Sequence, residues 1–86
     1  MTITLDSTAL SEAATDLTPG GKYSIFHRGT ISAAVQVDGD WLTIYEGRHG
    51  GGIVLMGLPG DSIQFTLSGE IVAGASEASI ELTEIP

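Results

Sequence analysis

Apolar and polar residues alternate with a period of two at several places along the chain. From Ile31 to Val37 every odd-numbered residue is apolar, and the residues between them are polar or small. The segments SIQFTLS at 62–68 and SIELT at 79–83 alternate in the same way. Successive side chains of a β-strand point to opposite faces of its sheet. Each segment is therefore predicted to be a strand with one face in a core and the other in water.

Residues that favour turns separate these segments at intervals of about 8 to 12 residues. The predicted turns are Pro19–Gly21, Arg28–Gly29, Asp38–Asp40, Gly47–Gly52, Pro59–Asp61 and Ser68–Glu70. Pro59 and Gly60 fit the centre of a type II turn, because proline presets φ and glycine accepts a positive φ. Short strands at this spacing predict an all-β fold, a small antiparallel β-sandwich or barrel of about seven to eight short strands.

The N-terminal segment has a less regular pattern. In STALSEAATDL, Ser7 fits a helix cap, while Leu10 among small residues fits an edge strand or an irregular arm equally well. With no linker or repeat in the sequence, we treat residues 1–86 as a single all-β domain in which 1–18 is an N-terminal arm or edge strand.

Two central segments are apolar on both predicted faces. In WLTIYEG, Trp41 and Tyr45 share one predicted face, and Leu42 and Ile44 share the other. IVLMGL at 53–58 is apolar throughout. A strand in an isolated sandwich needs only one buried face, so these strands are expected to cover a second face with a neighbouring subunit or a host surface. Closure of a barrel within one chain is the alternative.

Size and composition also favour association with a partner. A chain of 86 residues buries a modest fraction of its surface on folding, and this one has no cysteine for disulfides or thiolate metal sites. Charged residues are 16% of the chain, against roughly 25% in an average soluble protein. A surface so poor in charge is expected to face another protein in part.

The formal net charge of −8 comes from eleven acidic and three basic residues. This balance is the opposite of the basic surface that binds nucleic acid, so we expect no nucleic acid partner. The longest apolar run, 53–58, is too short to span a bilayer, and the N-terminus does not resemble a secretory signal. We therefore expect synthesis in the cytoplasm. We expect no membrane association.

The segment GRHGGG at 47–52 raises the question of a reactive loop. A phosphate-binding loop requires a lysine after the glycines and a helix behind them, whereas here IVLMG follows, which is typical of a strand. A turn between two strands explains the glycines better. Similarly, the Asp-Gly pair in DGD at 38–40 fits a hairpin turn better than half of a calcium site.

Catalysis is not indicated by either histidine. His27 and His49 both lie next to glycine turns, and the sequence has no motif such as GxSxG or HExxH. We predict that the chain is not an enzyme and binds no cofactor or metal.

Arginine fits a contact role better, because its planar fork pairs with carboxylates and it is enriched at interfaces. All three basic residues lie within 22–48, so this segment is the one expected to meet an acidic partner. Large aromatic residues with a polar group are interpreted as core or interface anchors. The residues predicted to form a partner or oligomer interface are Lys22, Arg28, Trp41, Tyr45, Arg48, His49 and Met56.

Three stretches, TITLDSTALSEAATDLTPGGKYSIFHRG, GIVLMGLPGDSIQFTLSGE and IVAGASEASIELTEI, together resemble small all-β accessory proteins of tailed-bacteriophage virions. In that layout a Thr/Ser-rich opening leads into a strand, a proline-glycine turn precedes a strand, and a segment of small residues leads to an alternating final strand.

The resemblance implies a capsid decoration (cement) protein on the exterior of the virion, present as a homotrimer or another small homo-oligomer. Its implied partners are further copies of itself and the major capsid protein or another virion protein. A phage tail or head-to-tail accessory protein shares the same sequence features. A carbohydrate-binding β-sandwich module is a further alternative, which requires an exposed aromatic platform.

Overall fold

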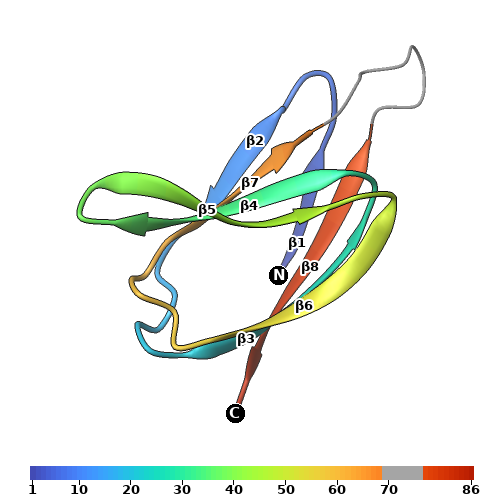
Figure 1. The fold of residues 1–86 in the computed structure, drawn as a ribbon. Helices are drawn as coiled ribbons and strands as arrows, with labels where there is room; N and C mark the ends of the chain where they lie inside the picture. Colours follow the sequence, from blue (N-terminus) through green and yellow to red (C-terminus); the bar gives the residue numbers. More distant parts are fainter. Residues whose placement is uncertain (69–76) are drawn as a thin grey trace.

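The computed structural model describes residues 1–68 and 77–86 of the chain (Figure 1). The strands are β1 (Thr2–Leu5), β2 (Ser11–Ala14), β3 (Lys22–Arg28), β4 (Ile31–Val37), β5 (Asp40–Gly47), β6 (Gly50–Met56), β7 (Ile63–Leu67) and β8 (Ala78–Ile85). The described residues contain no helix. The prediction of an all-β chain with seven to eight short strands is therefore confirmed.

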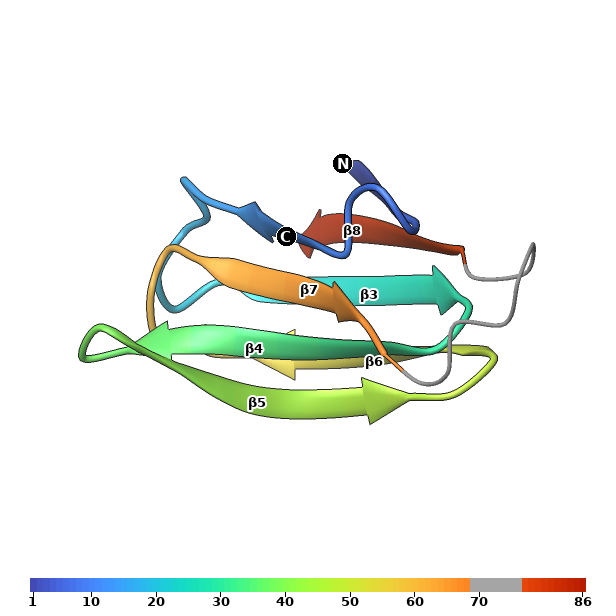
Figure 2. The ribbon, with the colours of Figure 1, turned by 90° about the horizontal axis from the view of Figure 1, so that it is seen from above.

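The strands form two four-stranded antiparallel sheets, ordered β1-β8-β3-β6 and β2-β7-β4-β5. Figure 2 looks onto β7, β4 and β5, with the other sheet behind them. Strand β1 pairs with β8, β2 with β7, β3 with β6 and β4 with β5. This nesting of four pairs in two sheets is the strand order of a jelly roll. Of the two predicted architectures, the sandwich is the one observed.

The core lies between the two sheets and follows the predicted alternation. On β4 the buried residues are Ile31, Ala33 and Val35, the odd-numbered positions of the segment. Phe65 on β7 and Ile80 on β8 are fully buried as well. Because apolar positions recur at every second residue, each strand of the pattern places one face in this shared core.

The N-terminal segment supplies one edge strand to each sheet. Strand β1 borders β8, and β2 borders β7. Asp6 shapes the reversal between them, because its Oδ1 accepts hydrogen bonds from the Thr8 and Ala9 amides at 2.8 and 3.0 Å. The helix considered for 7–17 is not formed, since Ser11–Ala14 is a strand. The segment therefore forms edge strands, which is one of the predicted alternatives.

The turn predictions are confirmed at one place and wrong at another. Asp38 and Gly39 both have positive φ, 51° and 85°, which makes the β4–β5 connection a type I′ hairpin turn as predicted. At Pro59-Gly60 the type II turn is wrong, because Gly57, with φ of 73°, takes the left-handed conformation and Gly60 does not. The chain bends directly after β6, where the amides of Gly57 and Leu58 both bond to the Gly21 carbonyl.

The glycine-rich segment is mostly strand. The reversal between β5 and β6 uses only Arg48 and His49, and the following glycines belong to β6. His49 has a φ of 64°. The prediction of a turn is therefore confirmed for two residues, while its extension through Gly52 is wrong. The last predicted turn, Ser68–Glu70, and the IVAGAS part of the resemblance lie almost wholly outside the described residues.

A β-bulge in β5 changes which side chains face the core. Opposite Ala33 lies Tyr45, and opposite Ala34 lies Thr43, so Ile44 is the extra residue. Ala33 is fully buried. Residues paired across two strands share a face, so Tyr45 points inward while Trp41, opposite Gln36, points outward. The prediction that Trp41 and Tyr45 share a face is therefore wrong, because a bulge inserts one residue between them.

Candidate functional site

One side of the sandwich is open along β5 and β6, the two long edge strands. A groove of about 360 Å³ runs between the sheets there. Its lining is apolar: Val35, Val37, Leu42, Ile44, Leu55, Met56, Gly57, Leu58 and Pro59. We call this feature the open groove. It exposes the margin of the core to solvent, because among the described residues no further strand follows β5 or β6 in either sheet.

Large apolar side chains are exposed on both strands that border the open groove. The exposed fractions are 74% for Met56, 58% for Leu42, 53% for Val54 and 41% for Trp41. Leu42 and Met56 line the open groove itself, whereas Val54 and Trp41 lie on the outer faces of the two different sheets. Apolar side chains are therefore exposed in the groove and on both strands beside it, which indicates a contact surface. In Figure 1 the β4–β5 turn projects to the left of the rest of the fold.

The predicted interface residues lie at two ends of the molecule. Lys22 and Met56 are exposed cross-strand neighbours on the outer face of β3 and β6. Arg28 lies at the other end of β3, beside the exposed Arg48 and His49 of the β5–β6 turn. Six residues of extended strand separate the ends of β3 by roughly 20 Å. The predicted residues therefore do not form one compact site.

The arginine end, formed by Arg28 and the β5–β6 turn, is accessible to solvent. Arg48 and His49 line a shallow hollow with Glu46, Thr30 and Ser68. The His49 amide lies 3.3 Å from the Thr30 hydroxyl, which orients the turn. Within residues 1–68 and 77–86, the N-terminal amine forms an ion pair with Glu81. None of the three basic side chains forms an ion pair with a described carboxylate.

Tyr45, one of the predicted interface residues, is half-buried and joins the two sheets from inside. Its hydroxyl lies 2.8 Å from His27 Nε2, and the two rings meet edge to face at 5.5 Å. His27 Nδ1 lies 3.0 Å from the Gly29 carbonyl. Since a carbonyl only accepts, Nδ1 carries the proton and Nε2 accepts from the Tyr45 hydroxyl when the ring is neutral.

Gly47 makes room for this pair. A Cβ atom at this position would lie 2.5 Å from both His27 Nε2 and the Tyr45 hydroxyl. The histidine is 5% exposed and bonds to a hydroxyl and a carbonyl, and no carboxylate among the described residues orients it as a general base. The pair is therefore built as a structural cross-link between β3 and β5.

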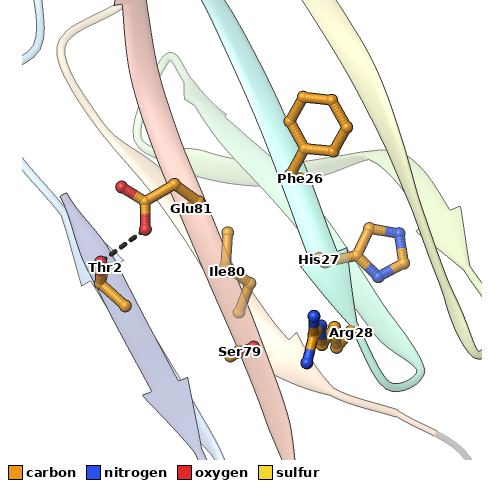
Figure 3. Close-up of a pocket in the computed structure, with 7 residues that line it drawn as sticks. All are labelled: Thr2, Phe26, His27, Arg28, Ser79, Ile80 and Glu81. Atoms are coloured by element: carbon orange, nitrogen blue, oxygen red, sulfur yellow. Dashed lines mark hydrogen bonds between the residues drawn. The ribbon is translucent and has the colours of Figure 1, made fainter.

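The outer face of the β1-β8-β3-β6 sheet carries a second accessible feature, shown in Figure 3. Phe26 is 68% exposed and lies opposite Glu81 on β8. Its ring covers Gly52 on β6, where a Cβ would approach it to 3.3 Å. A hollow of about 290 Å³ beside the ring is lined by Thr2, Phe26, His27, Arg28, Ser79, Ile80 and Glu81. The Thr2 hydroxyl donates to the Glu81 carboxylate and fixes it in place.

Sequence reasoning missed Phe26, Val54 and Leu42 as surface residues. The signal for Phe26 was present, because Tyr23, Ile25 and His27 alternate inward and leave the residues between them outward. Val54 lies in an apolar run whose faces the sequence does not distinguish.

The part of the chain that the structure describes contains no group of three His, Cys, Asp or Glu side chains arranged to hold a metal ion. In the same residues no helix is long and apolar enough to cross a membrane. Comparisons with protein-family models, curated proteins and solved structures return no match.

Proposed function

We propose that this chain is a non-enzymatic structural protein of a bacteriophage virion. In this proposal it is a capsid decoration protein, which forms a small homo-oligomer and stabilises the outer shell by binding the major capsid protein. It is made in the host cytoplasm and resides on the exterior of the capsid. The observation that carries the proposal is the open groove with its exposed apolar neighbours, which a monomer leaves in water.

The distribution of charge supports an exterior location. A net charge of −8 disfavours contact with packaged DNA. Arg28 and Arg48 at one end of the fold present guanidinium groups that suit carboxylates of a partner. The buried cross-link of His27 with Tyr45 supports a role without catalysis, because the histidine is already engaged on both ring nitrogens.

Binding to shells tests the proposal directly. Purified protein is mixed with expanded capsid shells of the phage that carries its gene, and the shells are sedimented and heated. We expect saturable binding in hundreds of copies and a higher temperature of shell disruption. A protein that stays in the supernatant at all concentrations would refute the decoration role.

The charge-reversing variant Arg48→Glu separates docking from folding. Arg48 is exposed in a turn, so the variant is expected to fold normally and to lose affinity for shells. Lys22→Glu makes the same change of charge at the far end of β3 and tests a second predicted contact. Loss of binding in Arg48→Glu alone would assign the contact to the arginine end, and full binding by both variants would refute a contact through these side chains.

Copy number distinguishes the decoration role from a tail or head-to-tail accessory role. Quantitative mass spectrometry of purified virions gives this number. Hundreds of copies per particle support decoration, and a few copies support a position in the tail or at the connector.

A carbohydrate-binding role is a second candidate, and Phe26 favours it. An exposed aromatic ring beside a fixed carboxylate, a serine and an arginine resembles a platform on which a sugar ring stacks and its hydroxyls bond. Trp41 is also exposed but lies on the other sheet, so it serves as the comparison residue. Saturation-transfer NMR with neutral and acidic oligosaccharides tests this role, with loss of signal expected in Phe26→Ala and retention in Trp41→Ala.

A further inference from the structure

The two sheets have four edge strands, and three of them carry features that discourage pairing with another chain. Strands β1 and β2 are each four residues long. Strand β5 contains Asp40 and Glu46 and a bulge opposite β4. Short length, charge and bulges are the common means by which natural sheets protect their edges.

Strand β6 has none of these features. It is seven residues long, with the sequence GGGIVLM, and contains no charge and no proline. Its register with β3 runs from Lys22–Met56 to Arg28–Gly50 without a shift. Along an edge strand, alternate residues direct their N–H and C=O groups away from the neighbouring strand. A long, regular and apolar edge of this kind is a template for one more strand.

We propose that β6 is the site of self-association, and that it pairs antiparallel with β6 of a second copy of this chain about a twofold axis. The two β1-β8-β3-β6 sheets then form one continuous sheet of eight strands. This inference rests on the proposed function, because it specifies how the small homo-oligomer forms.

The chemistry of the strand favours a second copy as its occupant. A charged arm of another protein would meet no opposite charge on β6, whereas another β6 presents only glycine and apolar residues. With the twofold axis at Val54, Ile53 meets Leu55 of the other copy on the core side. Both residues are half-buried in the single chain, so the pairing completes their burial.

The outer face of the same register is equally compatible. Val54 meets Val54 of the other copy, and Met56 lies over Gly52 beside the exposed Phe26 ring. Met56 and Val54 are 74% and 53% exposed in the single chain. A thioether against an aromatic ring is a favourable contact. No charged residue of one copy faces a like charge of the other within this strand.

A cysteine cross-link tests the register. The chain has no cysteine, so any disulfide forms only through an introduced thiol. Directly opposed residues of antiparallel strands have Cα atoms about 4.5 to 5.5 Å apart, which a disulfide spans. Val54→Cys is therefore expected to give a covalent dimer in high yield under mild oxidation. Thr43→Cys, an exposed residue of the other long edge strand, is the matched control and is expected to remain largely monomeric.

A charge placed on the edge tests the association itself. Light scattering after gel filtration is expected to give twice the monomer mass for the native chain and the monomer mass for Val54→Lys. Thr43→Lys, with the same charge added to β5, is expected to remain dimeric. Val54 is exposed, so the variant is expected to fold, and circular dichroism checks this.

A native chain that is monomeric or trimeric, or cross-linking of Thr43→Cys equal to that of Val54→Cys, would overturn the inference. Shell binding is measured separately on the same variants. Shells that bind the chain while β6 fails these tests would leave the decoration role standing and refute only the twofold pairing. A dimer through β6 that binds no shell would support the twofold pairing and refute the decoration role.

Discussion

The two sides of the sandwich differ in how completely they bury the core. On the β1–β2 side, Leu5 is fully buried, Ile3 is 3% exposed, and both edge strands are four residues long. On the β5–β6 side the edge strands are eight and seven residues long, and Leu42 is 58% exposed. We call these the closed side and the open side. One margin of the core is therefore covered by the chain itself, and the other is open to solvent.

The difference lies in the edges more than in the amount of apolar sequence. Both sides contain alternating apolar residues, yet on the closed side a short strand and the Asp6 turn fold back over the core. On the open side two long strands diverge from a tight turn at Arg48 and His49, and no segment among residues 1–68 and 77–86 fills the groove between them. Exposure of apolar residues therefore follows from topology.

Matched leucine variants should show the largest contrast. Leu5→Ala on the closed side is expected to lower the free energy of unfolding by about 2 to 5 kcal/mol, because it opens a cavity in a packed core. Leu42→Ala on the open side should cost less than about 1 kcal/mol, since little of its surface is buried in the single chain. Urea unfolding followed by Trp41 fluorescence measures both. Equal losses would show that the open side is covered in solution.

Gly47→Ala tests the cross-link that fastens β5 to the opposite sheet near the β5–β6 turn. The added methyl would meet His27 and Tyr45 at 2.5 Å, so we expect a loss of about 1 to 3 kcal/mol from overpacking. Gly51→Ala approaches the same two side chains at 3.5 Å or more and is the control. It should be tolerated, and thermal melts compare the two. A stable Gly47→Ala would mean that the pair is free to move apart.

Tyr45→Phe should have a smaller effect on the same cross-link. It removes one hydroxyl and leaves His27 Nε2 without its donor, for which we expect a loss of about 1 to 2 kcal/mol. A double-mutant cycle with His27→Leu isolates the pair. A coupling energy indistinguishable from zero would contradict the hydrogen bond between them.

The Asp6 turn on the closed side should give the smallest effect, visible as a dependence on pH. Hydrogen bonds from the Thr8 hydroxyl, then from the backbone amide of Thr8, hold the pKa of Asp6 below its ordinary value of 3.8. A lowered pKa in the folded state means that this contribution is present above pH 3.8 and is lost as the pH falls through the folded-state value. Asp6→Asn should remove that part of the acid dependence while keeping an acceptor for the turn. Identical acid unfolding curves for the native chain and Asp6→Asn would argue against this role.

The sequence predicts the strands well, because alternation of apolar and polar residues is what a strand with one buried face requires. The buried positions of β4, the type I′ turn at Asp38-Gly39 and the all-β class all follow from local pattern. The bulge at Ile44 does not, because an extra residue in one strand is visible only against its partner strand. For this reason the prediction that Tyr45 shares a face with Trp41 was wrong.

The candidate surfaces were predictable only in part. An apolar run such as IVLMGL indicates burial on two faces, but the order of strands decides which run becomes an edge. The choice of Lys22, Arg28 and Arg48 from charge alone gave exposed residues, yet it could not show that Arg48 lies beside Arg28 at one end of β3, with Lys22 at the other end. The roles of Gly47 and His27 depend on contacts between different sheets, which spacing along the chain does not encode.

The nested pairing of strands has a consequence for how the chain acquires its structure. Strands β4 and β5 are joined by a two-residue turn, and each further pair, β3 with β6, β2 with β7 and β1 with β8, lies outside the previous one. Once an inner pair has formed, the next pair closes only a short additional length of chain, which reduces its entropic cost. We therefore expect folding to proceed from the centre of the sequence toward its two ends. The termini, held together by the bond from the Met1 amine to the Leu82 carbonyl, would be the last part to close and the first to open.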